Sequence, residues 1–363
     1  EITYENGERQ IVATNTADWK YKYSPIVLNN LYGGETYDCR LETPDFADYD
    51  GDEEEWGKVV EDTVPKGELK LCMMPPVRII RTLPALSVKQ TSGKEDGAWI
   101  VDFGENVAGI VEIKIPNAPR GAQVTLRFTE NITESGNLDF RSAGSFATQC
   151  IQQDVYIARG DAQGEVWRPR FTYHAFRYME ITGYHDLRAY GTNPELSIGV
   201  CQVMSTDLTQ TGSFKSAHAE LDRLQNVMMS TFRSNYHGFP EDCPGREKCG
   251  WLGDAQVVCN TGIMNYDMEA SYEKYIHDFR TEDEVYGVWQ MIAPGKRGCG
   301  EASPLWGCAN VIMPYWMYRY YGNDGIVRSH WDQMEKWMRH EINDARNDKS
   351  LYEDELIISR GLG

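Results

Sequence analysis

An irregular segment over residues 242–254 holds the side chains best suited to chemistry in this sequence of 363 residues. It places three carboxylates, Asp242, Glu247 and Asp254, near one tryptophan, Trp251. Cleavage of a glycosidic bond needs one carboxylic acid to protonate the leaving oxygen and a second carboxylate to activate water or to attack. Further acids bind sugar hydroxyls, and an aromatic ring covers the apolar face of the sugar. The segment therefore favours sugar chemistry, and the alternative is a charged loop held by local ion pairs.

The same segment is rich in proline and glycine and lies between two stretches with helical periodicity. Loops held by a rigid scaffold are where binding and catalytic residues concentrate. Trp289 and Trp306 lie in similar loop-like sequence, so both are candidates to face a sugar. Tyr315 and Trp316 instead fit the core side of a helix.

Residues before about 205 alternate between apolar and polar side chains. The alternating runs cover 99–103, 111–115 and 124–128, and glycines such as Gly104 and Gly121 separate them. Side chains alternate across a strand, so each run would place one face on a core and one in water. Short antiparallel strands with turns between them predict a β-sandwich or jelly roll.

Residues after 205 follow a helical period instead. Helices of about 15–20 residues joined by short turns predict an array of helical hairpins. The apolar positions expected to share a helix face are Leu221, Leu224, Met228 and Phe232, then Ile312, Trp316 and Tyr320, and then Val327, Trp331, Met334, Trp337 and Met338.

The first 85 residues carry weaker patterns. Residues 45–62 are strongly acidic and are expected to form a solvated loop. Pro75-Pro76 forms a rigid joint, because proline fixes φ and lacks an N–H, and it marks a candidate boundary. We therefore divide the chain into residues 1–85, 86–204 and 205–363.

Composition excludes several classes of protein. Lys and Arg number 36 and Asp and Glu number 55, so the net charge is −19 and nucleic acid is not an expected partner. No apolar run approaches the roughly 18–20 residues of a membrane span. The sequence has neither GxGxxG nor GxxxxGK[ST], so no cofactor is expected.

The nine cysteines include no CxxC pair, and no pair has the spacing of metal ligands, so no metal site is expected. Mostly free thiols favour a reducing compartment, hence the cytoplasm. The chain begins with Glu1 rather than Met, so a signal segment could have been removed, and a periplasmic or secreted location stays open.

A long motif in the central segment carries a family resemblance. Asp242-Cys-Pro-Gly-Arg-Glu247-x-x-Gly250-Trp251-x-Gly253-Asp254-Ala255-Gln256 resembles the signature of the bacterial α-L-rhamnosidases, glycoside hydrolase family 78. Residues 18–38, 102–109, 121–130 and 169–178 also resemble that family, so the resemblance covers essentially the whole chain.

The resemblance implies a multidomain β + α architecture. Jelly-roll-like β-sandwich domains would precede an (α/α)6 six-hairpin barrel. Residues 1–85 would be part of an N-terminal jelly roll, 86–204 a β-sandwich, and 205–363 the N-terminal part of the barrel. A complete barrel needs about twelve helices and we count roughly five, so the barrel is expected to be truncated.

The resemblance also implies an activity: inverting hydrolysis of terminal non-reducing α-L-rhamnose, so that the expected partner is a rhamnose-containing glycoside or polysaccharide. Glu247 would be the general acid and must be protonated when it acts, which a water-poor pocket or neighbouring acids would favour. The side chains implied in substrate binding are Asp242, Arg246, Trp251, Asp254 and Trp306. Arg246 and Lys248 would oppose protonation of Glu247 if they point inward.

Two features depart from the family pattern. Family members commonly read Trp-Gly-Asp-Ala where this chain has Trp306-Gly307-Cys308-Ala309. The family's general base is a glutamate that would lie beyond residue 363. Two alternatives therefore stay open: a related six-hairpin glycosidase for a different terminal sugar, and a non-catalytic carbohydrate-binding protein. The sequence does not indicate an oligomeric state.

Overall fold

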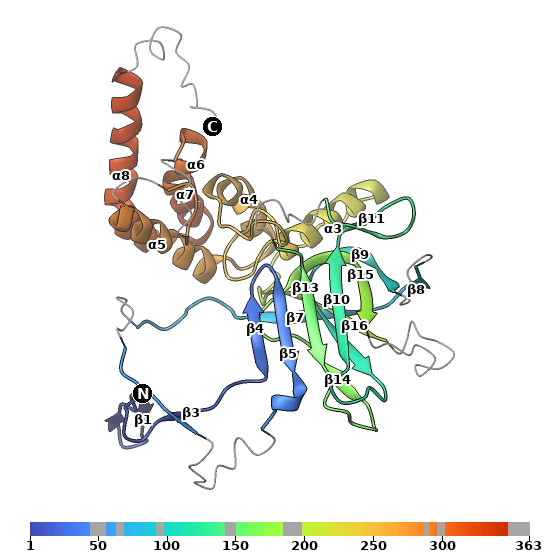
Figure 1. The fold of residues 1–363 in the computed structure, drawn as a ribbon. Helices are drawn as coiled ribbons and strands as arrows, with labels where there is room; N and C mark the ends of the chain where they lie inside the picture. The colour runs from blue at the N-terminus through green and yellow to red at the C-terminus, as the bar shows by residue number, and fades with distance from the viewer. Residues whose placement is uncertain are drawn as a thin grey trace.

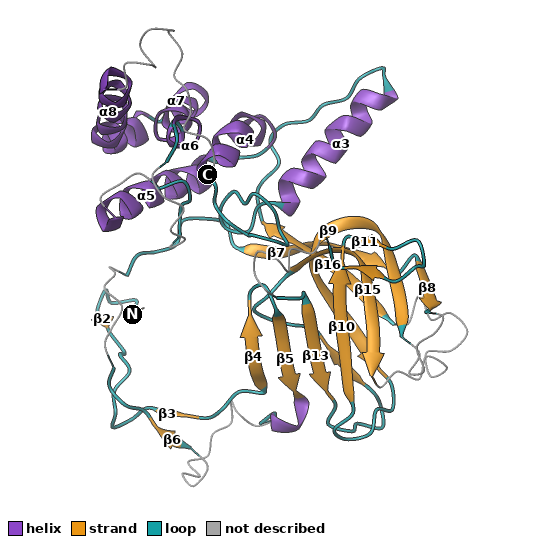
Figure 2. Ribbon diagram, turned by 45° about the horizontal axis from the view of Figure 1, so that its top comes forward, coloured by secondary structure: helices purple, strands orange, loops and turns teal. Residues whose placement is uncertain are grey.

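A computed structural model describes residues 1–43, 56–62, 69–91, 98–141, 150–183, 198–286, 290–295 and 302–347. Trp289 and most of the acidic segment 45–62 lie outside these residues. The described chain forms a large β-sheet body and a group of helices beside it, with the short strands near the N-terminus set apart from both (Figures 1 and 2).

Ten strands make the main sheet, and β8 and β14 pair with β9 beside the main path. The order across the sheet is β4 (Ile26–Asn30), β5 (Gly34–Asp38), β13 (Gln153–Ile157), β10 (Gln123–Thr129), β15 (His174–Gly183), β9 (Trp99–Ile115), β16 (Gly199–Thr206) and β7 (Val77–Pro84), with β8 at Ser87–Gln90 and β14 at Glu165–Trp167. All these pairings are antiparallel except β5 with β13. The shorter elements are β1 (Ile2–Thr3), β2 (Arg9–Gln10), β3 (Lys20–Tyr21), β6 (Gly57–Lys58), β11 (Asn131–Ile132), β12 (Leu138–Asp139) and the 3-10 turn η1 (Cys39–Leu41).

Strand β9 differs from the expectation of two short strands separated by a turn. It runs unbroken through 17 residues. Its first part pairs with β15 and its second part with β16 and β14. Gly104 adopts a φ of +81° within it, and the register with β15 shifts between Phe176 and Tyr178. A glycine at positive φ bends the strand without ending it.

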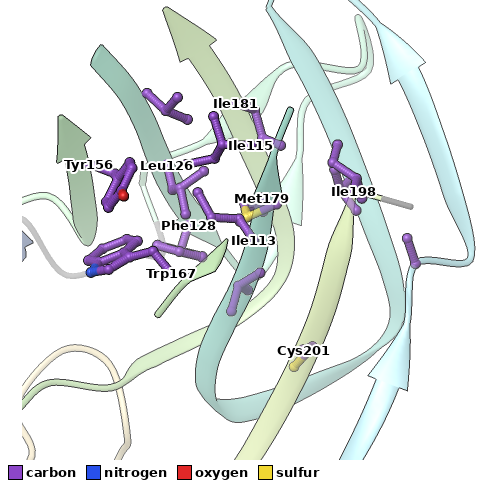
Figure 3. Packing of buried hydrophobic residues seen from close by; sticks show 14 of the residues in the cluster. Ile113, Ile115, Leu126, Phe128, Tyr156, Trp167, Met179, Ile181, Ile198 and Cys201 are labelled. Carbon is purple, nitrogen blue, oxygen red and sulfur yellow. The ribbon is translucent and has the colours of Figure 1, made fainter. Parts of the chain in front are cut away.

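The sheet encloses one apolar core, made by the inward residues of the alternating runs. Val101, Val111, Leu126 and Phe128 are at most 1% exposed. Figure 3 shows Leu126 and Phe128 beside Met179, Ile113 and Trp167, with side chains from several strands directed into the same interior. The apolar face of the predicted alternation is therefore confirmed. The opposite face of β10 does not lie in water as expected, since Thr125 and Thr129 are buried.

The helices build a second core after residue 205. Their bounds are α3 (Ala219–Ser234), α4 (Leu252–Asn265), α5 (Glu269–Tyr286), α6 (Pro304–Gly307), α7 (Ala309–Tyr321) and α8 (Asp324–Asn347). Helix α3 contacts the sheet at β16 and β9, whereas α4, α5, α6 and α8 all contact α7 or its neighbours. The fully buried side chains of this core include Ala255, Cys259, Tyr272, Tyr275, Ile276, Met313 and Met317.

Two helices are rotated from the faces that the sequence suggested. On α7 the residues without exposure are Ala309, Met313 and Met317, and the last two lie one position beyond the expected Ile312 and Trp316. On α8 the buried face includes His330, which contacts Asn310 of α7 at 3.2 Å between Nε2 and Oδ1. The expected Trp331 is 55% exposed, whereas the expected Trp337 is 2% exposed.

Three early strands, β4, β5 and β7, belong to the same sheet as β9, β10, β13, β15 and β16. The parallel pairing of β5 with β13 brings the turn at residues 31–33 to the end of the sheet nearest the helices (Figure 1). The division of the chain at residue 85 stays a prediction. No helix in the described ranges is long and apolar enough to cross a bilayer, and no disulfide joins the described cysteines.

Candidate active site

The loop between α3 and α4 closes on itself through its two ends. The amide of Asp242 donates to the carbonyl of Cys249 at 3.0 Å, and the amide of Cys249 donates back to Asp242 Oδ1 at 3.1 Å. The amide of Lys248 donates to the carbonyl of Cys243. Asp242 therefore ties the two ends of the loop together with one carboxylate oxygen. The residues between Asp242 and Cys249 form a compact bend.

Glu247 lies within this bend, and both of its carboxylate oxygens have donors. Trp251 Nε1 donates to Oε2 at 2.9 Å, and Arg246 Nη2 lies 2.9 Å from Oε1. Trp251 directly precedes α4, and its neighbour Leu252 donates its amide to the carbonyl of Met291. The start of a packed helix thus orients the indole that contacts Glu247, which is 20% exposed at its side chain.

Two other carboxylates lie near Glu247. Burial is the main cause that raises the pKa of Asp242, and the negative charge of Glu247 raises it further. Asp254, in the first turn of α4, also has a raised pKa, because partial burial disfavours its charged form and because the negative charge of Glu247 is near. Asp254 is an exposed residue, so water screens its charge more than it screens the charge of Asp242. The three acids therefore form a negatively charged group at this loop.

Replacing Asp242 by asparagine is expected to raise the unfolding free energy at pH 7. The pKa of Asp242 is higher in the folded than in the unfolded chain, so folding stability falls as pH rises through that interval, and the ionised form destabilises the fold at neutral pH. Asparagine keeps an oxygen for the amide of Cys249. Denaturant unfolding at pH 7 and pH 5 should show a gain that shrinks at the lower pH.

The matched control for that change is Asp207→Asn, because Asp207 is 54% exposed at its side chain and pairs with Arg78 on the surface. Its effect is expected to stay small at both pH values. If Asp242→Asn changes the unfolding free energy by the same amount at the two pH values, the electrostatic origin of the effect is contradicted.

Trp306 lies against the first turn of α4. A Cβ on Gly253 would come within 2.8 Å of the Trp306 indole, so only glycine permits this approach. The indole packs on the helical core and on a smaller buried pair, Ala302 and Trp337. Its buried Nε1 has no hydrogen-bond partner in the described part of the chain. Cys308, where the family commonly has an acid, donates its thiol to the carbonyl of Leu305 in its own turn.

The structure also shows contacts that the sequence did not reveal. Tyr32, in the turn between β4 and β5, donates its hydroxyl to the carbonyl of Glu247 at 2.8 Å. Lys248, which would oppose protonation of Glu247 only if it pointed inward, is 4% exposed and points toward the sheet, where its ammonium contacts the carbonyls of Leu31 and Tyr173. Arg246 does point at Glu247. Periodicity and motif spacing carry no signal for contacts between residues more than 200 positions apart.

One group of candidate metal ligands occurs among the described residues: Asp242, Glu247 and Cys249, whose ligand atoms lie within 4.8 Å of one another. Each already takes part in the hydrogen bonds of the loop, including the contact of Cys249 Sγ with the carbonyl of Glu247. These bonds account for the proximity of the three side chains without an ion.

Comparison with protein families divides the chain into three consecutive matches. Residues 1–81 match the α-L-rhamnosidase N-terminal domain, and residues 92–203 match the bacterial α-L-rhamnosidase concanavalin-like domain. Residues 209–357 match the bacterial α-L-rhamnosidase six-hairpin glycosidase domain. The order of a sheet-rich part followed by a helical hairpin part agrees with the fold described above.

Individual relatives give the same result. An α-L-rhamnosidase of Formosa agariphila is 36% identical over 346 residues, which cover 92% of this chain and 35% of the relative. One from an Alteromonas species is 31% identical over 96% of this chain and 37% of the relative. The chain thus spans about a third of the length of these relatives.

Solved structures extend the likeness to three dimensions. The α-L-rhamnosidase of Dictyoglumus thermophilum aligns with a TM-score of 0.85 at 29% identity, over 95% of this chain and 37% of that one. The Streptomyces avermitilis α-L-rhamnosidase complexed with L-rhamnose aligns with a TM-score of 0.82 at 28% identity, over 94% and 32%. The sequence of three matched domains, the relatives and the shared fold together show that this chain belongs to the bacterial α-L-rhamnosidase family.

Proposed function

We propose that the protein removes terminal non-reducing α-L-rhamnose from glycosides or polysaccharides, with Glu247 as the general acid. The observation that carries this proposal is the position of the Glu247 carboxyl. It accepts a hydrogen bond from the indole of Trp251 and lies near the carboxylates of Asp242 and Asp254. Such a group offers a proton donor, acceptors for sugar hydroxyls and an aromatic wall in one place.

Arg246 pairs with the Glu247 carboxylate, and the Arg246 side chain is 43% exposed, so bound sugar or water is able to displace it. In the proposed reaction the protonated carboxyl gives its proton to the glycosidic oxygen as the bond to the anomeric carbon breaks. Asp242, Arg246, Trp251, Asp254 and Trp306 are the proposed sugar-binding side chains.

An inverting mechanism is proposed, with the general base C-terminal to residue 363. An inverting pair is about 6.5–9.5 Å apart to leave room for a water molecule. Asp242 has a carboxylate oxygen within 4.8 Å of Glu247 and closes the loop with its Oδ1, so it does not suit the role of base. The resemblance to the family supports a later glutamate as the proposed base.

We expect the full-length gene product to hydrolyse p-nitrophenyl α-L-rhamnoside, and a protein limited to residues 1–363 to leave it intact, because the base would be missing. Released p-nitrophenol measures the rate. Proton NMR of the first sugar formed should show β-L-rhamnose, since inversion changes the anomeric configuration. If α-L-rhamnose forms first, the reaction is retaining, and Asp242 becomes the candidate nucleophile.

A different terminal sugar is the second candidate, favoured by Cys308. Its thiol bonds within its own turn, whereas a carboxylate at this position would add a charged acceptor beside Trp306. A folded full-length protein that cleaves another aryl glycoside and not the rhamnoside would select this candidate. A carbohydrate-binding protein without catalysis would bind rhamnose and cleave none of them.

A further inference from the structure

Lys248 is a buried lysine next to the proposed acid. It is 4% exposed, and its backbone adopts the left-handed conformation with a φ of 50°. Its ammonium contacts the carbonyl of Leu31 at 2.8 Å and the carbonyl of Tyr173, and it lies 3.7 Å from the centre of the Tyr173 ring. Lysine is seldom buried unless its head group is satisfied, so these contacts explain why it points toward the sheet.

The partner on the sheet side is itself held in place. The Tyr173 hydroxyl donates to Glu241, and the Tyr173 ring stacks on His237 with 4.1 Å between ring centres. His237 Nδ1 lies 2.9 Å from Glu241 Oε2, and its Nε2 lies 3.1 Å from the carbonyl of Met204 in β16. The carbonyl that receives Lys248 is therefore part of a buried network anchored in the sheet.

Electrostatics at Lys248 acts in two directions. Burial lowers its pKa to about 7, while the negative charges of Glu241 and Asp154 oppose that shift. Charged or neutral, the amine has enough N–H groups to donate to both carbonyls. The connection to Leu31 and Tyr173 thus persists on either side of neutral pH.

A second contact reaches the same peptide from the turn between β4 and β5. Tyr32 donates its hydroxyl to the carbonyl of Glu247, which is the carbonyl joined to the amide of Lys248. Asn30 Oδ1 accepts from the amides of Tyr32 and Gly33, so the turn has a fixed shape. The Glu247-Lys248 peptide is bonded to the sheet body on its carbonyl and on the adjoining side chain.

We propose that Lys248 and Tyr32 are positioning residues that clamp the Glu247-Lys248 peptide to the sheet and so set where Glu247 presents its carboxyl. This inference rests on the proposed role of Glu247. Tyr32 contacts the Glu247 carbonyl, and the Lys248 side chain anchors the residue that follows Glu247, so both act on Glu247 through the backbone. The β4–β5 turn is thereby part of the machinery that places the proton donor.

The test uses Lys248→Met in the full-length gene product, with two rhamnosides of different leaving ability. A misplaced acid matters most when the leaving group needs a proton. We expect kcat for methyl α-L-rhamnoside to fall roughly 10–100-fold with little change in KM. For 2,4-dinitrophenyl α-L-rhamnoside, which leaves without protonation, we expect a change of less than about threefold. Tyr32→Phe, which removes only the hydroxyl, should show the same contrast at smaller size.

Lys274→Met is the control, because the Lys274 ammonium is likewise hydrogen-bonded, to Asp278 on the same helix α5 and away from the loop. It should leave both rates unchanged. Equal losses on both substrates in Lys248→Met and Tyr32→Phe would overturn the proposal, as would unchanged rates in both. If Lys248→Met does not fold, the contrast in Tyr32→Phe decides. An inactive wild-type protein would instead refute the proposed function.

Discussion

Replacing Glu247 by glutamine in the full-length gene product is expected to lower kcat for an unactivated rhamnoside by about 10²–10⁴-fold. Glutamine keeps the size of the side chain and an acceptor for Trp251 Nε1, but it has no proton to give to the leaving oxygen. The affinity for free rhamnose, measured by calorimetry, should change little. The alkaline limb of the pH–rate profile should also disappear, since it reports loss of the proton from the acid.

Glu105→Gln supplies the control for that experiment, because Glu105 pairs with Arg81 on the sheet, and its side chain is 48% exposed. It should retain the rates and pH profile of the wild type. A Glu247→Gln protein that hydrolyses an unactivated rhamnoside at the normal rate would refute the assignment of the acid. Retained affinity with lost turnover would exclude a protein that only binds carbohydrate.

Gly250→Ala is expected to have the largest effect on stability. A Cβ at this position would lie 1.9 Å from the carbonyl oxygen of Ala293, so the backbone must move. The Gly250 carbonyl also accepts from the amide of Ala293 at 2.9 Å and from the hydroxyl of Tyr275 at 3.0 Å. Overpacking of this kind lowers the unfolding free energy by about 1–3 kcal/mol. Denaturant unfolding measures the change, and turnover should fall because Trp251 moves with the backbone.

Gly33→Ala is the comparison for Gly250→Ala. Its nearest neighbours to an added Cβ belong to Asn30 at 3.5 Å, which is ordinary contact. It should change the unfolding free energy by less than about 1 kcal/mol. Equal effects of the two substitutions would show that the close approach to Ala293 is not what requires glycine at position 250.

The strands of the sheet could be predicted because their signal is local. Ile113, Leu126 and Phe128 alternate with polar neighbours, and all three are buried as expected. The faces of α7 and α8 could not be predicted in the same way. Periodicity ranks apolar side chains, whereas the buried face of α8 includes His330, which contacts Asn310 of α7. A buried polar pair has no hydrophobic signature, so the expected face was rotated toward Trp331.

The candidate site divides along the same line. Asp242, Glu247 and Cys249 lie in one short loop, and the sequence places them together without any knowledge of the fold. The contacts of Tyr32 with Glu247 and of Lys248 with Tyr173 depend on the sheet order, in which β5 lies parallel to β13. Parallel pairing over more than 100 residues leaves no trace in the spacing of residues. The roles proposed for Arg246, Asp254 and Trp306 stay predictions.

The sheet order also sets the time at which the loop is completed. Tyr32 and Glu247 are 215 positions apart, and Leu31 and Lys248 are 217 apart. Ribosomes add about 5–20 residues per second, so roughly 10–40 s separate the synthesis of the two partners. Contacts of such long range form slowly because the intervening chain must first be ordered. Leu31 and Tyr32 are therefore synthesised well before the peptide that they contact, and Glu247 reaches its place only after the loop over residues 242–254 has been made.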